Sequence, residues 1–318
     1  MEVLVAVFWI LVGFILLIRG ADFLVDGSSS IAKKARIPQI IIGLTIVSIG
    51  TSMPELFVST TSAINGHSDM AIGNVAGSNI CNLLLILGLS AIIRTVKFQK
   101  ETRFMEIPMT LGLTIIFIIL CNTGNIISRI EAIILLALFL MFIVYTIIMA
   151  KKGEQFDGEE NKEESPKDMS ILKSIIFIIL GVVALKFGGD FTVNNAVILA
   201  NHFNVSEQII SLTILAIGTS LPELVTSVTA AIKGNSDIAI GNIIGSNIFN
   251  MLLIIGVSAL IKPILYNLSY NIDMIFVIAA TLILALFPVI PPKNKMTRIN
   301  GIIYVIIYIV YLVTLFIK

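Results

Sequence analysis

A long internal duplication is the feature of this sequence that most restricts its fold. Residues 10–93 align with residues 178–261 at a constant offset of 168 residues and without a gap. From residue 43 onward, about two-thirds of the aligned positions are identical. Self-similarity at a fixed offset is typical of a fold built from repeated structural units. The chain is therefore predicted to contain two copies of one unit.

Both copies are too apolar for a water-soluble domain. Hydrophobic residues make up 57% of the 318 residues and charged residues only 13%, whereas soluble domains have about 25% charged residues. Apolar runs of about 18 or more residues, long enough to cross a bilayer as helices, recur throughout. We predict an all-α polytopic membrane protein with ten transmembrane helices, at residues 3–19, 38–64, 70–93, 104–121, 128–149, 171–187, 206–232, 238–261, 272–288 and 300–317.

The number of spans in each copy fixes how the copies are related. Each contains five, and an odd number brings the second copy into the membrane from the opposite face. We therefore predict two inverted five-helix repeats, at residues 1–150 and 170–318, with the most similar segments at 43–89 and 211–257. Residues 151–169 between them are rich in Glu, Asp, Lys and Asn and are expected to form a charged linker.

The basic residues give an orientation. In this topology 17 of the 21 Lys and Arg residues fall on the side of the linker, which the positive-inside rule identifies as cytoplasmic. We expect both termini to be extracellular and the protein to lie in the plasma membrane. Asp22 and Asp190 lie within one turn of Arg19 and Lys186, and we expect an interfacial ion pair at each.

The first repeated motif places a glutamate in each of two apolar spans. It reads Gly-Thr-Ser-Met-Pro-Glu at residues 50–55 and Gly-Thr-Ser-Leu-Pro-Glu at residues 218–223. A carboxylate near the bilayer midplane costs about 2.5–3.5 kcal/mol by insertion scales and is rarely kept there without a function. The prolines cannot donate the next helical hydrogen bond, so we expect both helices to be broken there. Carboxylate, carbonyl and hydroxyl oxygens suit hard cations such as Ca2+ and Na+.

The second motif supplies a polar helix face. Residues 73–82 read Gly-Asn-Val-Ala-Gly-Ser-Asn-Ile-Cys-Asn and residues 241–250 repeat the pattern. Positions four apart lie on one face of a helix, so Asn74, Ser78 and Asn82 form a polar stripe. We expect the helices of residues 38–64, 70–93, 206–232 and 238–261 to be broken and to form a central site. Its candidate ligands are Glu55, Glu223, Thr51, Thr219, Ser52, Ser220, Ser78, Ser246, Asn82 and Asn250.

Each of these residues also has a structural interpretation. Buried carboxyl groups can be protonated and hydrogen-bonded between the two halves. Asn and Ser commonly bond one membrane helix to another, and Ser and Thr often bond to the preceding turn. Asn74, Asn79, Asn242 and Asn247 are divided between the two interpretations, because four amides per motif exceed what one ion needs. For the two glutamates the cation site is the favoured hypothesis, since two carboxylates balance the charge of one Ca2+.

At these residues the sequence resembles the cation/calcium antiporter superfamily, specifically the prokaryotic and archaeal Na+/Ca2+ exchangers. The resemblance covers both repeated motifs and extends over the ten-helix frame. It implies a Ca2+ site made by Glu55, Glu223 and the backbone of Thr51 and Thr219. It further implies flanking Na+ sites made by Ser52, Ser78, Ser220 and Ser246, with the carbonyls of Ser48 and Ala216. It also implies that the first and sixth spans slide together across the other helices to alternate access.

One residue departs from the pattern of the resemblance. Some members carry Asp at the position of Asn250, whereas here both equivalent positions, Asn82 and Asn250, are amides. We therefore expect K+-independent exchange. The resemblance implies electrogenic exchange of three Na+ for one Ca2+, by a functional monomer in the lipid bilayer.

Three other functions were weighed against Na+/Ca2+ exchange. An H+/Ca2+ exchanger is the main alternative, because membrane carboxylates can trade protons for a metal. A channel is disfavoured by the inverted duplication and its central site. An enzyme is disfavoured because the sequence has neither a nucleophile and base pair nor a catalytic metal motif. No cofactor and no nucleic-acid partner are expected; the transported ions are Na+ and Ca2+.

Overall fold

The protein is almost entirely helical, and its structure is a computed structural model that describes residues 2–152, 169–203 and 216–317. Most of the predicted linker at 151–169 lies outside the described residues. So do the first residues of the expected span 206–232 and of the repeated segment 211–257.

The elements of the first half follow one another as helices with two short strands. They are α1 (Glu2–Ala35), α2 (Gln39–Ile42), the π-helix η1 (Gly43–Val47), α3 (Ser48–Thr51), α4 (Met53–Asn65), α5 (Ser68–Ile80), the π-helix η2 (Cys81–Ile86), α6 (Leu87–Ile93), β1 (Val96–Lys97), the π-helix η3 (Thr102–Glu106), α7 (Ile107–Asn122), β2 (Ile126–Ile127) and α8 (Arg129–Lys152).

Where it is described, the second half repeats this order of elements, except that no π-helix stands between β3 and α15. They are α9 (Ile171–His202), α11 (Ala216–Thr219), α12 (Leu221–Ile232), α13 (Ser236–Phe249), the π-helix η6 (Asn250–Ile254), α14 (Ile255–Ile261), β3 (Ile264–Leu265), α15 (Tyr270–Leu286), β4 (Lys295–Met296) and α16 (Arg298–Ile317).

These helices fall in the ten segments that the sequence predicts. Within the described residues, seven helices are long and apolar enough to cross a membrane, and the pair Gln39–Thr51 and Met53–Asn65 forms one more span with a bend of 51°. Two shorter apolar helices, Leu221–Ile232 and Tyr270–Leu286, occupy two further segments. α1 and α9 extend well beyond the apolar cores predicted for them.

The expected interruption of residues 70–93 and 238–261 takes a different form from that of 38–64. Each of the two segments is one continuous helix that passes through a π-helical stretch, η2 in the first half and η6 in the second. A π-helix inserts an extra residue in a turn and is frequent at functional sites. No proline interrupts these helices, which explains why they widen locally rather than break.

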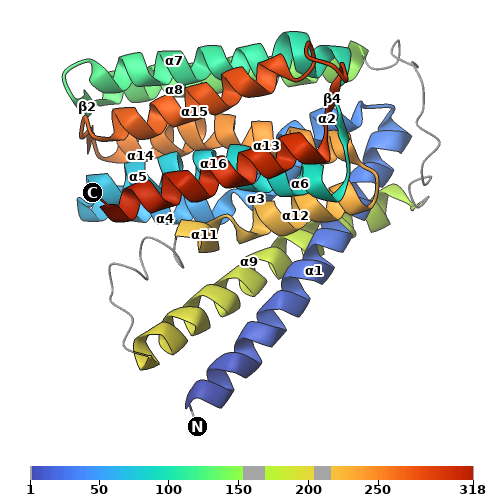
Figure 1. Cartoon of the computed structure of the whole chain (residues 1–318), viewed down its shortest axis with the longest axis horizontal. Coiled ribbons are helices and arrows are strands. Elements are labelled where there is room, and N and C mark those ends of the chain that lie inside the picture. The colour runs from blue at the N-terminus through green and yellow to red at the C-terminus, as the bar shows by residue number, and fades with distance from the viewer. Residues whose placement is uncertain (1, 153–168, 204–215, 318) are drawn as a thin grey trace.

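The two short sheets show that the repeats are inverted. Strand β1 pairs with β4 and β2 pairs with β3, so each sheet joins one strand from each half. By the offset of 168 residues, β1 corresponds to β3. β1 lies beside β4 and β3 beside β2, and β4 and β2 are at opposite ends of the helical bundle (Figure 1). The predicted inversion is therefore confirmed.

α1 and α9 form a tightly packed pair that crosses the other helices obliquely (Figure 1). A Cβ added to Gly20 would lie 2.9 Å from the carbonyl oxygen of Gly181, and one added to Gly188 would lie 2.8 Å from that of Gly13. Gly13 and Gly181, like Gly20 and Gly188, are equivalent positions of the two repeats. Small residues let the two backbones touch, as is typical of helix pairs in membranes.

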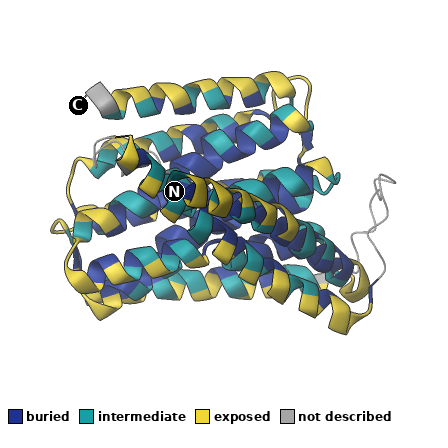
Figure 2. Cartoon of the chain, turned by 90° about the horizontal axis from the view of Figure 1, so that it is seen from below, coloured by how far each residue is buried: buried dark blue, intermediate teal, exposed yellow. Residues whose placement is uncertain are grey.

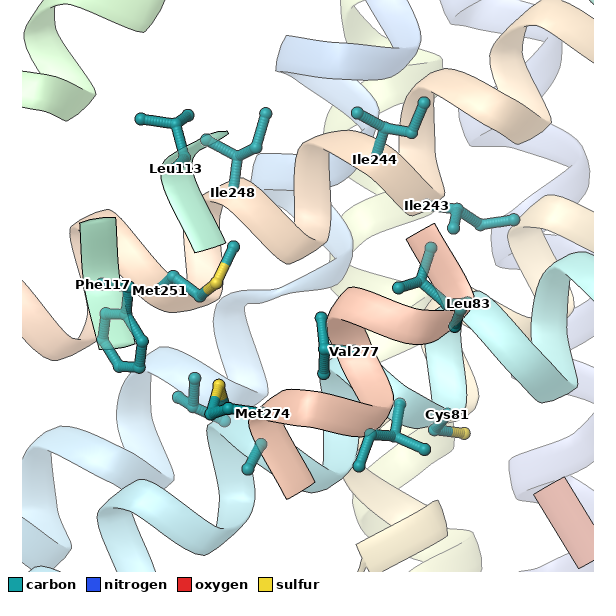
Figure 3. Close-up of a cluster of buried hydrophobic side chains, with 14 of the residues drawn as sticks. Cys81, Leu83, Leu113, Phe117, Ile243, Ile244, Ile248, Met251, Met274 and Val277 are labelled. Atoms are coloured by element: carbon teal, nitrogen blue, oxygen red, sulfur yellow. The ribbon is translucent and has the colours of Figure 1, made fainter. Parts of the chain in front are cut away.

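Burial follows the opposite rule from that of a soluble protein. Large apolar side chains are exposed along the outer helices (Figure 2), where a bilayer would cover them. The helices Ser68–Ile93 and Ser236–Ile261 are the most enclosed, with 72% and 83% of their most apolar stretch buried. An apolar cluster surrounds them, in which Met274 and Val277 of α15 lie among side chains from η2, α7 and α13 (Figure 3).

Ion pairs at Lys233 tie α1 to the end of α12. The Lys233 Nζ lies 2.9 Å from Asp22 Oδ1 and 2.8 Å from Asp26 Oδ1. The pair expected between Asp22 and Arg19 is therefore wrong: helix packing brings Lys233 to Asp22 from a distant part of the chain. The pair expected between Lys186 and Asp190 is confirmed at 2.8 Å.

We predict that Lys233→Met destabilises the protein more than Lys186→Met does. The Lys233 side chain is 24% exposed, and its loss removes one ion partner from each of two partly buried carboxylates, at a cost of about 1–3 kcal/mol. The Lys186 side chain is 56% exposed in a pair within one helix, worth about 0.3–0.5 kcal/mol. Melting temperatures of the detergent-purified variants test this, and equal shifts would contradict it.

Candidate cation site

Two helix breaks at equivalent positions position the repeated glutamates. α3 ends at Thr51 and α4 begins at Met53, with Ser52 between them at φ −84° and ψ 9°. In the second half Ser220 has φ −87° and ψ 6° between α11 and α12. Proline in the first turn of α4 and of α12 removes the N–H that would continue the preceding helix. The break predicted from the sequence is thus present in both halves.

Each break creates a new helix N-terminus directly before the glutamate. Glu55 lies in the first turn of α4 and Glu223 in the first turn of α12. The partial positive charge of a helix N-terminus stabilises a carboxylate placed there. This matters because both side chains are withdrawn from solvent, with exposures of 0% for Glu55 and 1% for Glu223.

Each glutamate meets a serine from the other repeat. Ser52 Oγ donates to Glu223 Oε1 at 2.8 Å. Ser220 Oγ lies 3.4 Å from Glu55 Oε1 and 3.2 Å from Ser78 Oγ, and can donate its proton to either. The two carboxylates, 168 residues apart in the sequence, therefore belong to one site.

Several buried oxygens around this site lack a hydrogen-bond partner in the described part of the chain. They belong to both carboxylates, to two amides and to one hydroxyl, and are Glu55 Oε2, Glu223 Oε2, Asn82 Oδ1, Asn250 Oδ1 and Ser246 Oγ. Buried polar atoms are normally paired, and exceptions often mark a missing ion or water. Carboxylate, amide and hydroxyl oxygens are the ligands that Ca2+ and Na+ take.

The threonines of the first motif are held by asparagines of the second. Thr51 Oγ1 donates to Asn242 Oδ1 at 3.0 Å, and Asn242 Nδ2 donates to Ser227 Oγ at 2.9 Å. The other half repeats the chain: Thr219 Oγ1 donates to Asn74 Oδ1 at 3.2 Å, and Asn74 Nδ2 donates to Ser59 Oγ at 2.9 Å. The threonine hydroxyls and these two amides are therefore used within the protein.

The remaining predicted residues differ in how they are placed. Ser48 Oγ donates to the carbonyl of Leu44 at 2.8 Å, so its side chain bonds to its own helix. The carbonyl of Ser48 accepts the N–H of Ser52 at 3.0 Å. Ala216 is the first residue of α11. Asn79 and Asn247 lie on the interface between α5 and α13 and are paired with each other's helices.

Ser59 and Ser227 were missed by the sequence analysis although both are fully buried beside the site. A signal was available: they are equivalent positions of the two repeats and lie four residues after Glu55 and Glu223, hence on the same helix face.

The side chains gathered here offer oxygen atoms, the kind that hard cations take. Among the described residues, no group of three or more His, Cys, Asp or Glu side chains that could hold a metal ion is found. The site instead combines two carboxylates with neutral oxygens from hydroxyl and amide groups.

Comparison with known proteins places this arrangement in a family. The sodium/calcium exchanger protein family matches residues 5–148 and 173–317. The chain belongs to the sodium/calcium exchanger family. Its members are transporters rather than enzymes, and their activity is cation/Ca2+ antiport.

Individual relatives cover nearly the whole chain. A putative antiporter, CaxA of Alkalimonas amylolytica, is 38% identical over 98% of this chain and 99% of its own length. The sodium/calcium exchanger MaX1 of Methanosarcina acetivorans is 31% identical over 96% of this chain and 97% of its own. A solved structure of the sodium-calcium exchanger NCX_Mj is 32% identical over 98% of this chain and 99% of its own, with a TM-score of 0.85.

We predict that Ser52→Ala weakens cation binding by about tenfold or more. It removes a hydroxyl oxygen from the site and the donor to Glu223, and a hydrogen bond to a charged group is worth about 1.5–3 kcal/mol. Thr45→Val is the matched control, since the Thr45 hydroxyl donates only to the carbonyl of Ile41 in its own helix. Ca2+ titration of both purified variants measures the effect, and equal affinities would contradict the role of Ser52.

Proposed function

We propose that this protein exchanges Na+ for Ca2+ across the plasma membrane by alternating access. The observation that carries the proposal is the pair of buried carboxylates, each linked to a serine of the other repeat and each with one unpartnered oxygen. Two carboxylates neutralise one Ca2+. Na+ and Ca2+ share a preference for oxygen ligands, whereas Mg2+ demands tight octahedral geometry and holds its water.

The predicted ligands would be shared between the two ions. In this proposal Glu55, Glu223 and the backbone of Thr51 and Thr219 hold Ca2+. The flanking Na+ sites use Ser52, Ser220, Ser78 and Ser246, with Asn82 and Asn250 nearby and the carbonyls of Ser48 and Ala216. Because the ligand sets overlap, binding of one ion expels the other.

The coupling is proposed to be electrogenic and K+-independent. Exchange of three Na+ for one Ca2+ moves one net charge, worth about 2.3 kcal/mol per 100 mV, so a negative interior favours Ca2+ extrusion. K+-independence is supported by the amides at Asn82 and Asn250, which leave two carboxylates rather than three at the centre.

Ion access to the site is proposed to depend on α1 and α9, and the chain is proposed to have a fixed orientation in the membrane. The closely packed pair α1 and α9 would slide as one body across the remaining helices. All proposed ligands come from one chain, which supports a functional monomer. The distribution of Lys and Arg supports extracellular termini and a cytoplasmic segment at 151–169.

We predict that Glu55→Gln and Glu223→Gln each abolish Ca2+ uptake into vesicles loaded with Na+. Each variant leaves only one carboxylate to balance a divalent ion. Loss of one partner of a buried charge pair costs about 3–5 kcal/mol, which lowers the affinity for Ca2+ more than about 100-fold. Asp190→Asn is the control, because that carboxylate is 43% exposed and pairs with Lys186. Uptake by either glutamine variant at the wild-type rate would refute the site.

The same vesicles can distinguish Na+ coupling from the alternative, H+ coupling. We predict uptake that requires internal Na+ and does not respond to an imposed pH gradient when choline replaces Na+. The carboxylates would then be occupied by metal ions in both half-cycles rather than by protons. Uptake driven by the pH gradient in the absence of Na+ would instead assign H+/Ca2+ exchange.

A further inference from the structure

Four asparagine side chains form a hydrogen-bonded cluster where the helices Ser68–Ile93 and Ser236–Ile261 meet. Asn82 Nδ2 donates to Asn247 Oδ1, and Asn250 Nδ2 donates to Asn79 Oδ1, both at 3.0 Å. Asn79 Nδ2 donates to the carbonyl of Asn247 at 3.4 Å, and Asn247 Nδ2 donates to the carbonyl of Asn79 at 3.3 Å. All four side chains have 0% exposure. The cluster joins the two repeats at equivalent positions.

The asparagines at the centre of the cluster and those at its ends are used differently. Asn79 and Asn247 each donate with their amide nitrogen and accept with their amide oxygen. Asn82 and Asn250 donate, but their own Oδ1 atoms find no partner among the described residues. Two buried amide oxygens are therefore left over, one from each repeat.

These free oxygens lie on the helix faces that carry the site serines. Asn82 follows Ser78 by four residues and Asn250 follows Ser246 by four, which places each pair on one helix face. Ser78 is joined through Ser220 to the Glu55 carboxylate. The Ser246 hydroxyl is itself buried and has no hydrogen-bond partner in the part of the chain that the structure describes.

The orientation of an asparagine amide decides whether it attracts or repels a cation. Its oxygen is an acceptor and its NH2 group carries only donors. The Oδ1 atom of Asn247 or Asn79 that accepts from the NH2 group of Asn82 or Asn250 keeps that group away from the site and leaves the oxygen available. Rotation of the Asn82 or Asn250 amide by half a turn would present N–H groups to the ion and bring two amide oxygens together in the cluster.

We propose that Asn79 and Asn247 are positioning residues, each of which orients the amide of the asparagine from the opposite repeat. Asn79 orients Asn250, and Asn247 orients Asn82, so that an oxygen faces the cation in each case. This inference rests on the proposed cation site. It adds two residues that orient the amide ligands of that site without touching the ion.

Replacing the oriented amide with a carboxylate distinguishes an orienting role of Asn79 from a role in packing alone. Asp has two oxygens and no N–H, so a residue whose role is to orient an amide becomes dispensable beside it. Asn79→Ala should therefore weaken Ca2+ binding in the wild-type background but have little effect in the Asn250→Asp background. In the Asn82→Asp background its effect should persist, because Asn79 does not orient Asn82.

The experiment is equilibrium Ca2+ titration of six purified proteins: wild type, Asn79→Ala, Asn250→Asp, Asn82→Asp, and Asn79→Ala combined with each Asp variant. We expect Asn79→Ala to raise the dissociation constant about tenfold, equivalent to about 1.4 kcal/mol, in the wild-type and Asn82→Asp backgrounds. In the Asn250→Asp background the rise should be less than about twofold. Asn79→Leu, closer in volume to Asn, replaces any Ala variant that does not purify as a folded species.

Each outcome has one meaning. An equal loss in all three backgrounds would overturn the positioning role and leave Asn79 as a packing residue, with the cation site intact. No loss in the wild-type background would also overturn it. Failure of the wild-type protein to bind Ca2+ would overturn the proposed function itself, and the inference with it. The mirror set, Asn247→Ala with Asn82→Asp, should give the same pattern with the roles of the Asp variants exchanged.

Discussion

The burial of two carboxylates inside an apolar bundle is the constraint on which the rest of this structure depends. A carboxylate at the centre of a membrane costs about 2.5–3.5 kcal/mol, and here two of them share one site. The breaks at Ser52 and Ser220 lower this cost, because each places its glutamate in the first turn of a new helix. The serines that face the carboxylates lie at the breaks themselves. Each helix break thus provides both a helix N-terminus for its own glutamate and a serine hydroxyl that faces the glutamate of the other repeat.

Neither repeat can complete this site alone. The hydroxyl that bonds Glu223 comes from the first half and the one that faces Glu55 comes from the second. The same exchange recurs from Thr51 to Asn242 and from Thr219 to Asn74. Such an exchange requires the two repeats to interlock across a pseudo-two-fold axis, and an odd number of spans per repeat places that axis in the membrane plane.

The sequence was sufficient for the frame and for the helix breaks that carry the two glutamates. Length, apolar runs and the odd number of spans per repeat predict the inverted architecture, and the proline beside each glutamate predicts the helix break. The partners of individual polar groups were not predictable, because they depend on which helices meet. Asp22 pairs with Lys233 from α12 rather than with its neighbour Arg19. Asn74 and Asn242 bond threonines of the other repeat, and the local widening at η2 and η6 has no proline or glycine signal that distinguishes it from a regular helix.

The duplication also makes visible where the two repeats are not equivalent. By the offset of 168 residues, Lys233 corresponds to Asn65 and Asp26 corresponds to Asn194. The ion pairs that join Lys233 to α1 therefore have no ionic counterpart at the equivalent positions of α4 and α9. Two inverted repeats of identical sequence would hold α1 and α9 with equal energy at either end of the bundle. Asp22 has a charged counterpart in Asp190, so the charges of this cluster differ between the repeats at two positions, Lys233 and Asp26. Under the proposed exchange cycle, the two end states related by the repeat would therefore not be equally populated, and part of that difference lies in these two side chains outside the cation site.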